Sequence, residues 1–171
     1  LSAIPATPAK TVFVLPNNKN IIMAAEQAIP LADRSVMVLP TSTIPQGVSA
    51  MLAFDPSAGA EENFITMQKA AEHVSTGLVT YAARDSEFGG FAIKQGDYLA
   101  LMEHQLFGTD QDLDALLSRL AASQEIQSAE FISIFYGEDV SQEQAQQTAD
   151  LFGSACPNAE VNLLPGGQPV Y

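Results

Sequence analysis

The chain is short of positive charge, and this shortage argues against a role in nucleic-acid binding. Seven lysine and arginine residues stand against 20 aspartate and glutamate residues, a net charge of −13 over 171 residues. A surface that binds nucleic acid needs a basic footprint to displace counterions from the phosphates. Long apolar runs are also missing, since none approaches the roughly 20 residues of a membrane-spanning helix. The beginning, LSAIPATPAK, lacks the basic and apolar regions of a signal peptide.

Cysteine is nearly absent as well. Cys156 is the only one and cannot form an internal disulfide, which agrees with a reducing, cytoplasmic location. His73 and His104 lie far apart without a cysteine partner, so no metal-ligand spacing is visible. Nucleophile elbows, Walker-type loops and dinucleotide fingerprints are missing, and nothing assembles a nucleophile with a base. We therefore expect no catalytic residue and no metal site in this chain.

The negative charge is distributed unevenly. Residues 1–80 hold 6 acidic and 4 basic side chains, a net of −2, whereas residues 81–171 hold 14 and 3, a net of −11. One interpretation is that the acidic surface maintains solubility. The other is an acidic face that steers a basic protein partner.

The most informative feature present is a strand ending that occurs twice. TVFVLPNNKN (Thr11–Asn20) and SVMVLPTSTIPQG (Ser35–Gly47) place V-x-V-L-P 24 positions apart. A buried parallel strand needs a near-continuous apolar run, and proline ends it because proline cannot donate to the ladder. Apolar spacing over residues 18–29 predicts a connecting helix. The pattern therefore indicates a βαβ unit, in which ligands and partners bind at the carboxyl ends of the strands.

Polar residues follow both strand ends and are expected at one edge of the sheet: Asn17, Asn18, Lys19, Thr41, Ser42, Thr43, Gln46 and Gly47. Lys19 beside a helix N-terminus would suit an anion or phosphate. Alternatively, Asn17 or Asn18 is only an N-cap and Lys19 a solvated charge. Serine and threonine are also common turn residues, so the second loop allows both interpretations.

Beyond these strands, the pattern predicts two subdomains. The first continues with a short helix near residues 45–54 and then a second helix that ends at about residue 74. From Gly77 the spacing favours an antiparallel meander, with strands at 78–83, 91–93 and 97–102 and a turn at 86–90. Capping signals at Thr109 with Asp112, and at Ser141 with Gln144, predict two later helices, and apolar runs predict strands at 131–136 and 161–164.

We therefore expect an α/β protein in three parts. Residues 1–10 are a linker or frayed end. Residues 11–75 form a parallel α/β subdomain, and residues 76–171 form a mixed or antiparallel α+β subdomain with a truncated last strand. Two parallel strands make an incomplete sheet, so the chain is expected to be a fragment. The missing strands would come from a partner chain, a second copy in a homodimer, or segments lost from both ends.

Two further charged sites leave alternatives open. Arg84 and Asp85 close a predicted strand, where Arg84 could bind an anion or a partner carboxylate. The alternative is a surface ion pair of little energetic value. Gly137-Glu138-Asp139 could hold a cation or could simply be a solvated helix cap.

Six ordered motifs resemble a known family: LPNNKNI (15–21), LPTSTIPQGVSAMLAF (39–54), VTYAARDS (79–86), QGDYLAL (95–101), YGEDV (136–140) and GGQPVY (166–171). From Thr11 onward the chain is similar to the C-terminal region of the ATP-dependent subunit of bacterial fatty acid kinases. These proteins are dihydroxyacetone kinase-like, also called DAK phosphatase-like.

The resemblance implies a DegV-like (EDD-type) fold and a function. In this family, a DegV-type partner presents a bound fatty acid, and the kinase domain phosphorylates its carboxylate to an acyl phosphate. ATP and magnesium belong to an N-terminal domain outside this chain. The resemblance thus implies a non-catalytic domain that docks the DegV-type fatty-acid-binding protein or positions it against its own kinase domain. The alternative is a small-molecule site for a phosphate or acyl ligand, and an independent enzyme is the weakest candidate.

Overall fold

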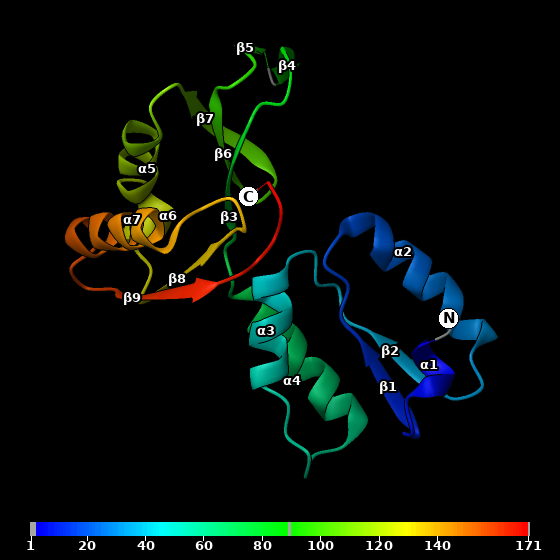
Figure 1. The fold of residues 1–171 in the computed structure, drawn as a ribbon. Helices are drawn as coiled ribbons and strands as arrows, with labels where there is room; N and C mark the ends of the chain where they lie inside the picture. The colour runs from blue at the N-terminus through cyan, green and yellow to red at the C-terminus, as the bar shows by residue number, and fades with distance from the viewer. Residues whose placement is uncertain (1–2, 89, 171) are drawn as a thin grey trace. The chain divides into compact units, whose positions relative to one another are not determined.

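The fold is described from a computed structural model, for residues 3–88 and 90–170. It divides into two compact units, unit 1 (Leu1–Thr76) and unit 2 (Gly77–Tyr171), each described by itself. Figure 1 shows helices and strands in both. The chain is therefore a mixed α/β protein, as its sequence predicts.

Unit 1 contains a single βαβ motif followed by two packed helices. Its elements are α1 (Ala3–Ala6), β1 (Thr11–Val14), α2 (Lys19–Ala28), η1 (Ile29–Leu31), β2 (Ser35–Val38), α3 (Ile44–Leu52) and α4 (Ala60–Glu72). The predicted connecting helix is confirmed, because α2 begins after the N-cap Asn18 and ends at Ile29.

The two copies of the repeated strand pair with each other in parallel. Val12 lies opposite Val36, and Val14 lies opposite Val38. The ladder continues beyond the strand, where the Leu39 amide donates to the Val14 carbonyl at 2.9 Å. The repeat in the sequence therefore places chemically equivalent residues side by side.

The two faces of this small sheet pack against different helices. On one face Phe13 meets Phe54 edge to face, with ring centroids 6.1 Å apart. Phe13, Leu15 and Phe64 surround a buried cluster made of Leu39, Ala50, Met67 and Ala71. The other face meets α2 (Figure 1). Side chains that alternate along a strand explain how four-residue strands serve both layers.

Asn63 closes the loop between α3 and α4. Its side chain is buried, accepts from the Asp55 amide at 2.8 Å and donates to the Asp55 carbonyl at 2.7 Å. The Asp55 carboxylate in turn accepts from the Ser57 hydroxyl and amide, which lowers the pKa of Asp55. A buried polar side chain is thus fully used in shaping the turn.

Arg34 ties the first residues of the chain to the start of β2. Its guanidinium donates to the Thr7 carbonyl at 2.6 Å and pairs with the neighbouring Asp33 at 2.7 Å. That hydrogen bond lowers the pKa of Asp33. Where a linker or frayed end is predicted, the described part contains the short helix α1, whose Ile4 is buried.

Unit 2 contains three small sheets and three helices among the residues described. Its elements are β3 (Gly77–Tyr81), β4 (Ser86–Phe88), β5 (Phe91–Ile93), β6 (Tyr98–Met102), β7 (Gln105–Asp110), α5 (Leu113–Ala121), α6 (Gln124–Gln127), β8 (Phe131–Tyr136), α7 (Gln142–Ala155) and β9 (Glu160–Pro165).

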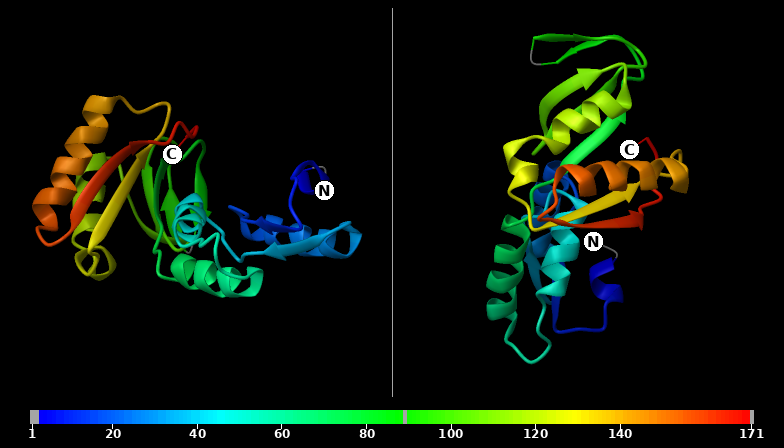
Figure 2. Two further views of the ribbon diagram at one scale, coloured as in Figure 1. Left: turned by 90° about the horizontal axis from the view of Figure 1, so that it is seen from below. Right: turned by 90° about the vertical axis from the view of Figure 1, so that its left-hand side faces the viewer.

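Pairing in unit 2 is antiparallel first and parallel later. β3, β6 and β7 form one antiparallel sheet, and β4 and β5 form a separate hairpin. β8 and β9 pair in parallel, joined by α7. The views in Figure 2 show α7, in orange, alongside this strand pair. The predicted meander through residues 91–93 is therefore wrong, because β5 pairs with β4 and not with the sheet of β3 and β6. The unit is an antiparallel sheet with a separate hairpin, followed by a second βαβ motif.

The core of unit 2 lies under α5. Leu116, Leu117 and Leu120 of α5 are buried. They cluster with Ala100, Ala121, Ile132, Phe152 and Cys156. Cys156 is thus a small core residue, whose thiol lies 3.7 Å from the Ala121 carbonyl oxygen.

Two further local predictions in unit 2 are wrong. Residues 86–88 form strand β4 rather than a turn, because backbone pairing with β5 holds a segment whose three residues are all exposed. Thr109 belongs to β7, and Asp112 is the N-cap of α5. The turn before β7 was not predicted, because its residues Glu103 and His104 both have positive φ. Asparagine-glycine is the usual sequence signal for such a turn.

The capping box at α7 is confirmed and supports a first prediction. Ser141 accepts from the Gln144 amide at 3.2 Å, and the Gln144 side chain accepts from the Ser141 amide at 3.1 Å. Ser141→Ala should destabilise unit 2 by about 1 kcal/mol, measured by urea unfolding. Ser141→Asp, which can still cap, is the matched control; equal losses for both variants would contradict the capping role.

Across the described residues, none of the helices combines the length and the hydropathy that a bilayer crossing requires.

Candidate functional site

The two predicted strand-end loops meet at the carboxyl ends of β1 and β2. We call this region, residues 16–19 and 40–47, the strand-end edge. The Thr41 hydroxyl donates to the Pro16 carbonyl at 2.6 Å, and Thr41 is completely buried. Parallel strands end at the same side of a sheet, so one hydrogen bond suffices to join loops 25 residues apart in the chain.

The first loop is exposed and opens α2. Asn18 is the N-cap, and its side chain accepts from the Asn20 amide at 2.9 Å. The side chains of Asn17 and Lys19 are exposed and have no hydrogen bond or ion pair within the described residues. Asn18 is thus the N-cap that the sequence allowed, while Asn17 and Lys19 remain available to a ligand or partner.

The second loop is organised around the start of α3. Thr43 is the N-cap and accepts from the Gln46 amide at 3.3 Å. The Gln46 side-chain oxygen accepts from the Ser42 amide at 2.8 Å, and Thr43 also bonds Thr76 at 2.9 Å. These contacts shape the loop itself, which is what turn residues commonly do. Thr43 and Gln46 therefore serve to cap the start of α3, whether or not the loop also binds a ligand or partner.

A stripe of exposed apolar residues continues from this loop along α3. It comprises Ile44, Val48, Met51 and Leu52, all of them exposed, with Leu52 at 84%. Gly47 lies on the same side of the helix by its spacing, and a Cβ at Gly47 would meet nothing within 4 Å. We call these five residues the α3 stripe.

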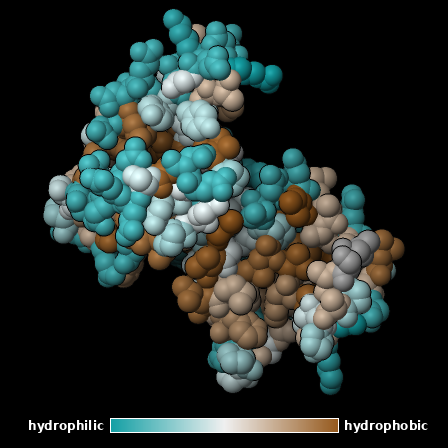
Figure 3. Space-filling model, in the orientation of Figure 1, coloured by the Kyte–Doolittle hydropathy of each residue, from teal (hydrophilic) through white to brown (hydrophobic). Residues whose placement is uncertain are grey.

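The sequence does not indicate that the α3 stripe is exposed, because an apolar helix next to a strand is typical of a core. Figure 3 shows hydrophobic side chains gathered over unit 1, α3 among them, while the visible face of unit 2 is mainly hydrophilic. Adjoining exposed apolar side chains mark interaction surfaces, so the outer side of α3 is a candidate for one.

Arg84 and Asp85 belong to unit 2. The Asp85 carboxylate accepts from the Gln95 amide at 2.8 Å and so closes the loop before β6. Arg84 is exposed and takes part in no ion pair among the residues described. A role for Arg84 in binding an anion stays a prediction.

The chemistry available at the strand-end edge is modest. Lys19 is the only charged residue in these two segments, and it is the first residue of α2. Within the described part of the chain, no three histidine, cysteine or acidic side chains are grouped so as to hold a metal ion. The edge therefore offers positive potential, amides and hydroxyls, together with an apolar helix face.

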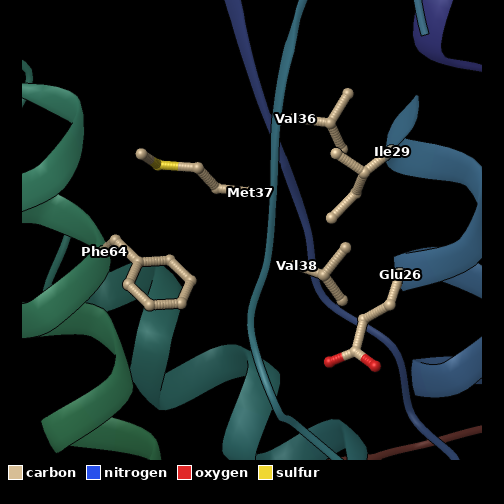
Figure 4. Close-up of a pocket in the computed structure, with 6 residues that line it drawn as sticks. All are labelled: Glu26, Ile29, Val36, Met37, Val38 and Phe64. Carbon is tan, nitrogen blue, oxygen red and sulfur yellow. The ribbon is translucent and has the colours of Figure 1, made fainter. Parts of the chain in front are cut away.

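A shallow hollow of about 270 Å³ lies elsewhere, beside β2 (Figure 4). Its lining consists of Glu26, Ile29, Val36, Met37, Val38 and Phe64. None of these residues belongs to the predicted site, so the hollow is a separate feature of unit 1.

Comparison with known proteins gives one family and a group of longer relatives. The whole chain, residues 1–171, matches the family of FakA-like C-terminal domains, FakA being a subunit of fatty acid kinase. Protein YloV of Bacillus subtilis is 39% identical over 171 residues. Uncharacterized proteins of Staphylococcus haemolyticus and Staphylococcus aureus are 34% and 33% identical. Each alignment covers the whole of this chain and 31% of the relative. The chain therefore spans about a third of the length of these relatives.

Proposed function

Because the chain belongs to the family of FakA-like C-terminal domains of fatty acid kinase, we propose that it is a non-catalytic docking domain with a DegV-like fold. Its partner is a DegV-type fatty-acid-binding protein, which it holds so that the bound fatty acid can be phosphorylated to an acyl phosphate. ATP and magnesium act in a kinase domain outside this chain. The complex works in the cytoplasm.

The observation that carries this proposal is the α3 stripe beside the strand-end edge. Exposed aliphatic side chains at positions 44, 48, 51 and 52 form one continuous side of a helix. Burying such a stripe against another protein removes apolar area from water, at about 25 cal/mol per Å². Asn17 and Lys19 supply polar groups at the rim, where protein interfaces are usually polar.

A docking role also agrees with how the polar residues of the edge are used. Thr41, Thr43 and Gln46 are engaged in holding the loops and capping α3. A catalytic or ligand-binding role would need polar groups that converge on an enclosed space. The hollow beside β2 has none of these residues in its lining.

Leu52→Asp is expected to weaken binding of the DegV-type partner by about tenfold or more, because a charge replaces an apolar contact at the interface. Isothermal titration calorimetry of the 171-residue chain with the purified partner measures the dissociation constant. Leu52 is 84% exposed, so the stability of unit 1 should hardly change.

Leu31→Asp is the matched control, since Leu31 is similarly exposed on η1 but lies outside the α3 stripe. It should leave the affinity unchanged. Equal effects at the two positions, or no binding of the unaltered chain at tens of micromolar, would contradict docking through α3. An affinity that falls steeply with salt would instead point to the acidic residues of unit 2, because salt screens exposed charges.

A further inference from the structure

The backbone of β2 presents unpaired groups on the side away from β1. In a parallel ladder, alternate residues direct both their N–H and C=O groups to the same neighbour. Leu39 bonds to Val14 across the ladder, and Val38 lies opposite Val14. The alternation therefore directs the backbone N–H and C=O groups of Met37 toward β1, and the same groups of Val36 and Val38 away from β1. In the described residues no strand pairs with this outer edge, because the sheet contains β1 and β2 alone.

Apolar walls flank this outer edge on both faces of the sheet. Figure 4 shows Met37 and Phe64 on one side of β2, and Val36, Val38 and Ile29 on the other. Together with Glu26, these residues enclose the hollow of about 270 Å³. β1 contributes no residue to that lining. The hollow thus combines outward-facing peptide groups with side-chain contacts above and below, as a binding site for an extended strand requires.

β2 also lacks the features that protect an edge strand from pairing. Ser35, Val36, Met37 and Val38 include no charge and no proline. Natural proteins block exposed edges with lysine, proline or bulges, or cover them. A parallel sheet of two strands is likewise unusual, because parallel strands are normally buried on both faces within larger sheets. The edge therefore has the character of an internal strand.

We propose that the outer edge of β2 pairs with a β-strand from the polypeptide that precedes this region in the longer protein. The relatives are about three times as long as this chain, which covers 31% of each. The matching family is described as C-terminal, so a segment on the N-terminal side of this region is the occupant that we choose. The occupant is an extended segment with apolar side chains on both faces, to match the two walls. This inference does not depend on the docking surface proposed for α3.

A second copy of the chain fits the edge less well. Pairing within one polypeptide avoids the entropic cost of bringing separate molecules together.

Residue-level hydrogen exchange in the longer, full-length protein tests the proposal. The amides of Val36 and Val38 should exchange as slowly as those of Met37 and Leu39, which bond to β1 in any case. In the 171-residue chain alone, Val36 and Val38 should exchange at least about tenfold faster, while Met37 and Leu39 stay protected. The inner amides thus report whether the β1–β2 ladder is intact.

A proline variant supplies the second measurement. Val38→Pro removes an outward N–H, and proline is tolerated at the free side of an edge strand. In the full-length protein it should accelerate exchange at Val36 while leaving Met37 protected. Fast exchange at Val36 and Val38 in the unaltered full-length protein would overturn the proposal. So would protection in the isolated chain that rises with its concentration, because the occupant would then be a second copy.

Discussion

Replacing Leu116 with alanine is expected to destabilise unit 2 by about 2–5 kcal/mol. Leu116 is completely buried and belongs to the cluster that joins α5 to β6, β8 and α7. The substitution removes apolar contacts and leaves a cavity that the surrounding helix and strands can fill only in part. Urea unfolding, followed through the amide NMR signals of unit 2, measures the loss.

Leu164→Ala is the matched control, because Leu164 on β9 is 41% exposed. The same chemical change there should cost less than half as much, since solvent already reaches the side chain. A loss of stability at Leu116 no larger than that at Leu164 would show that α5 does not anchor the core of unit 2. Because the two units have separate buried clusters, the amide signals of unit 1 should respond less than those of unit 2.

Thr41→Val is expected to destabilise unit 1 by about 1–3 kcal/mol. The substitution keeps the shape of the side chain but removes the hydroxyl that donates to the Pro16 carbonyl at 2.6 Å. Thr41 is completely buried, and Pro16 is buried as well. The carbonyl would therefore lose its donor in a place where water cannot readily replace it.

Thr41→Ser is the control, because it retains the hydroxyl and loses only a methyl group. Its loss of stability should be the smaller of the two, measured by urea unfolding of the same chain. The opposite order would mean that packing of the methyl group, rather than the hydrogen bond, holds the strand-end edge together. If α3 docks a partner, Thr41→Val should also weaken docking, because the loop that starts α3 would no longer be held.

The longer helices and most strands could be predicted because their signals are local, whereas the short helices α1 and α6 were not predicted. Apolar spacing located α2, and the Ser141–Gln144 pair located the start of α7. The strands β4 and β7 could not be found in this way. β4 is only three residues long, fully exposed and dependent on its partner strand. β7 begins after a turn whose residue types do not indicate their positive φ.

For the candidate site, the sequence identified the place but not the use of each residue. The juxtaposition of the loops follows from two parallel strand ends, so Thr41 and Pro16 could be expected near each other. That Thr43 and Gln46 cap α3 depends on the position where the helix begins. The exposed α3 stripe could not be predicted, because a run such as IPQGVSAML is equally suited to a core.

The amino-acid sequence by itself determined the βαβ motif of unit 1, the capping box of α7 and the unequal charge of the two halves. These features depend on residues that are close in the chain, or on a repeat whose copies must pair. Tertiary structure alone decided which apolar residues are buried and which remain exposed. Burial depends on what lies against a side chain in space, as the completely buried Leu39 and the exposed Leu52 demonstrate. The same reason applies to β2, whose unpaired outer edge becomes visible only once its single neighbour is known.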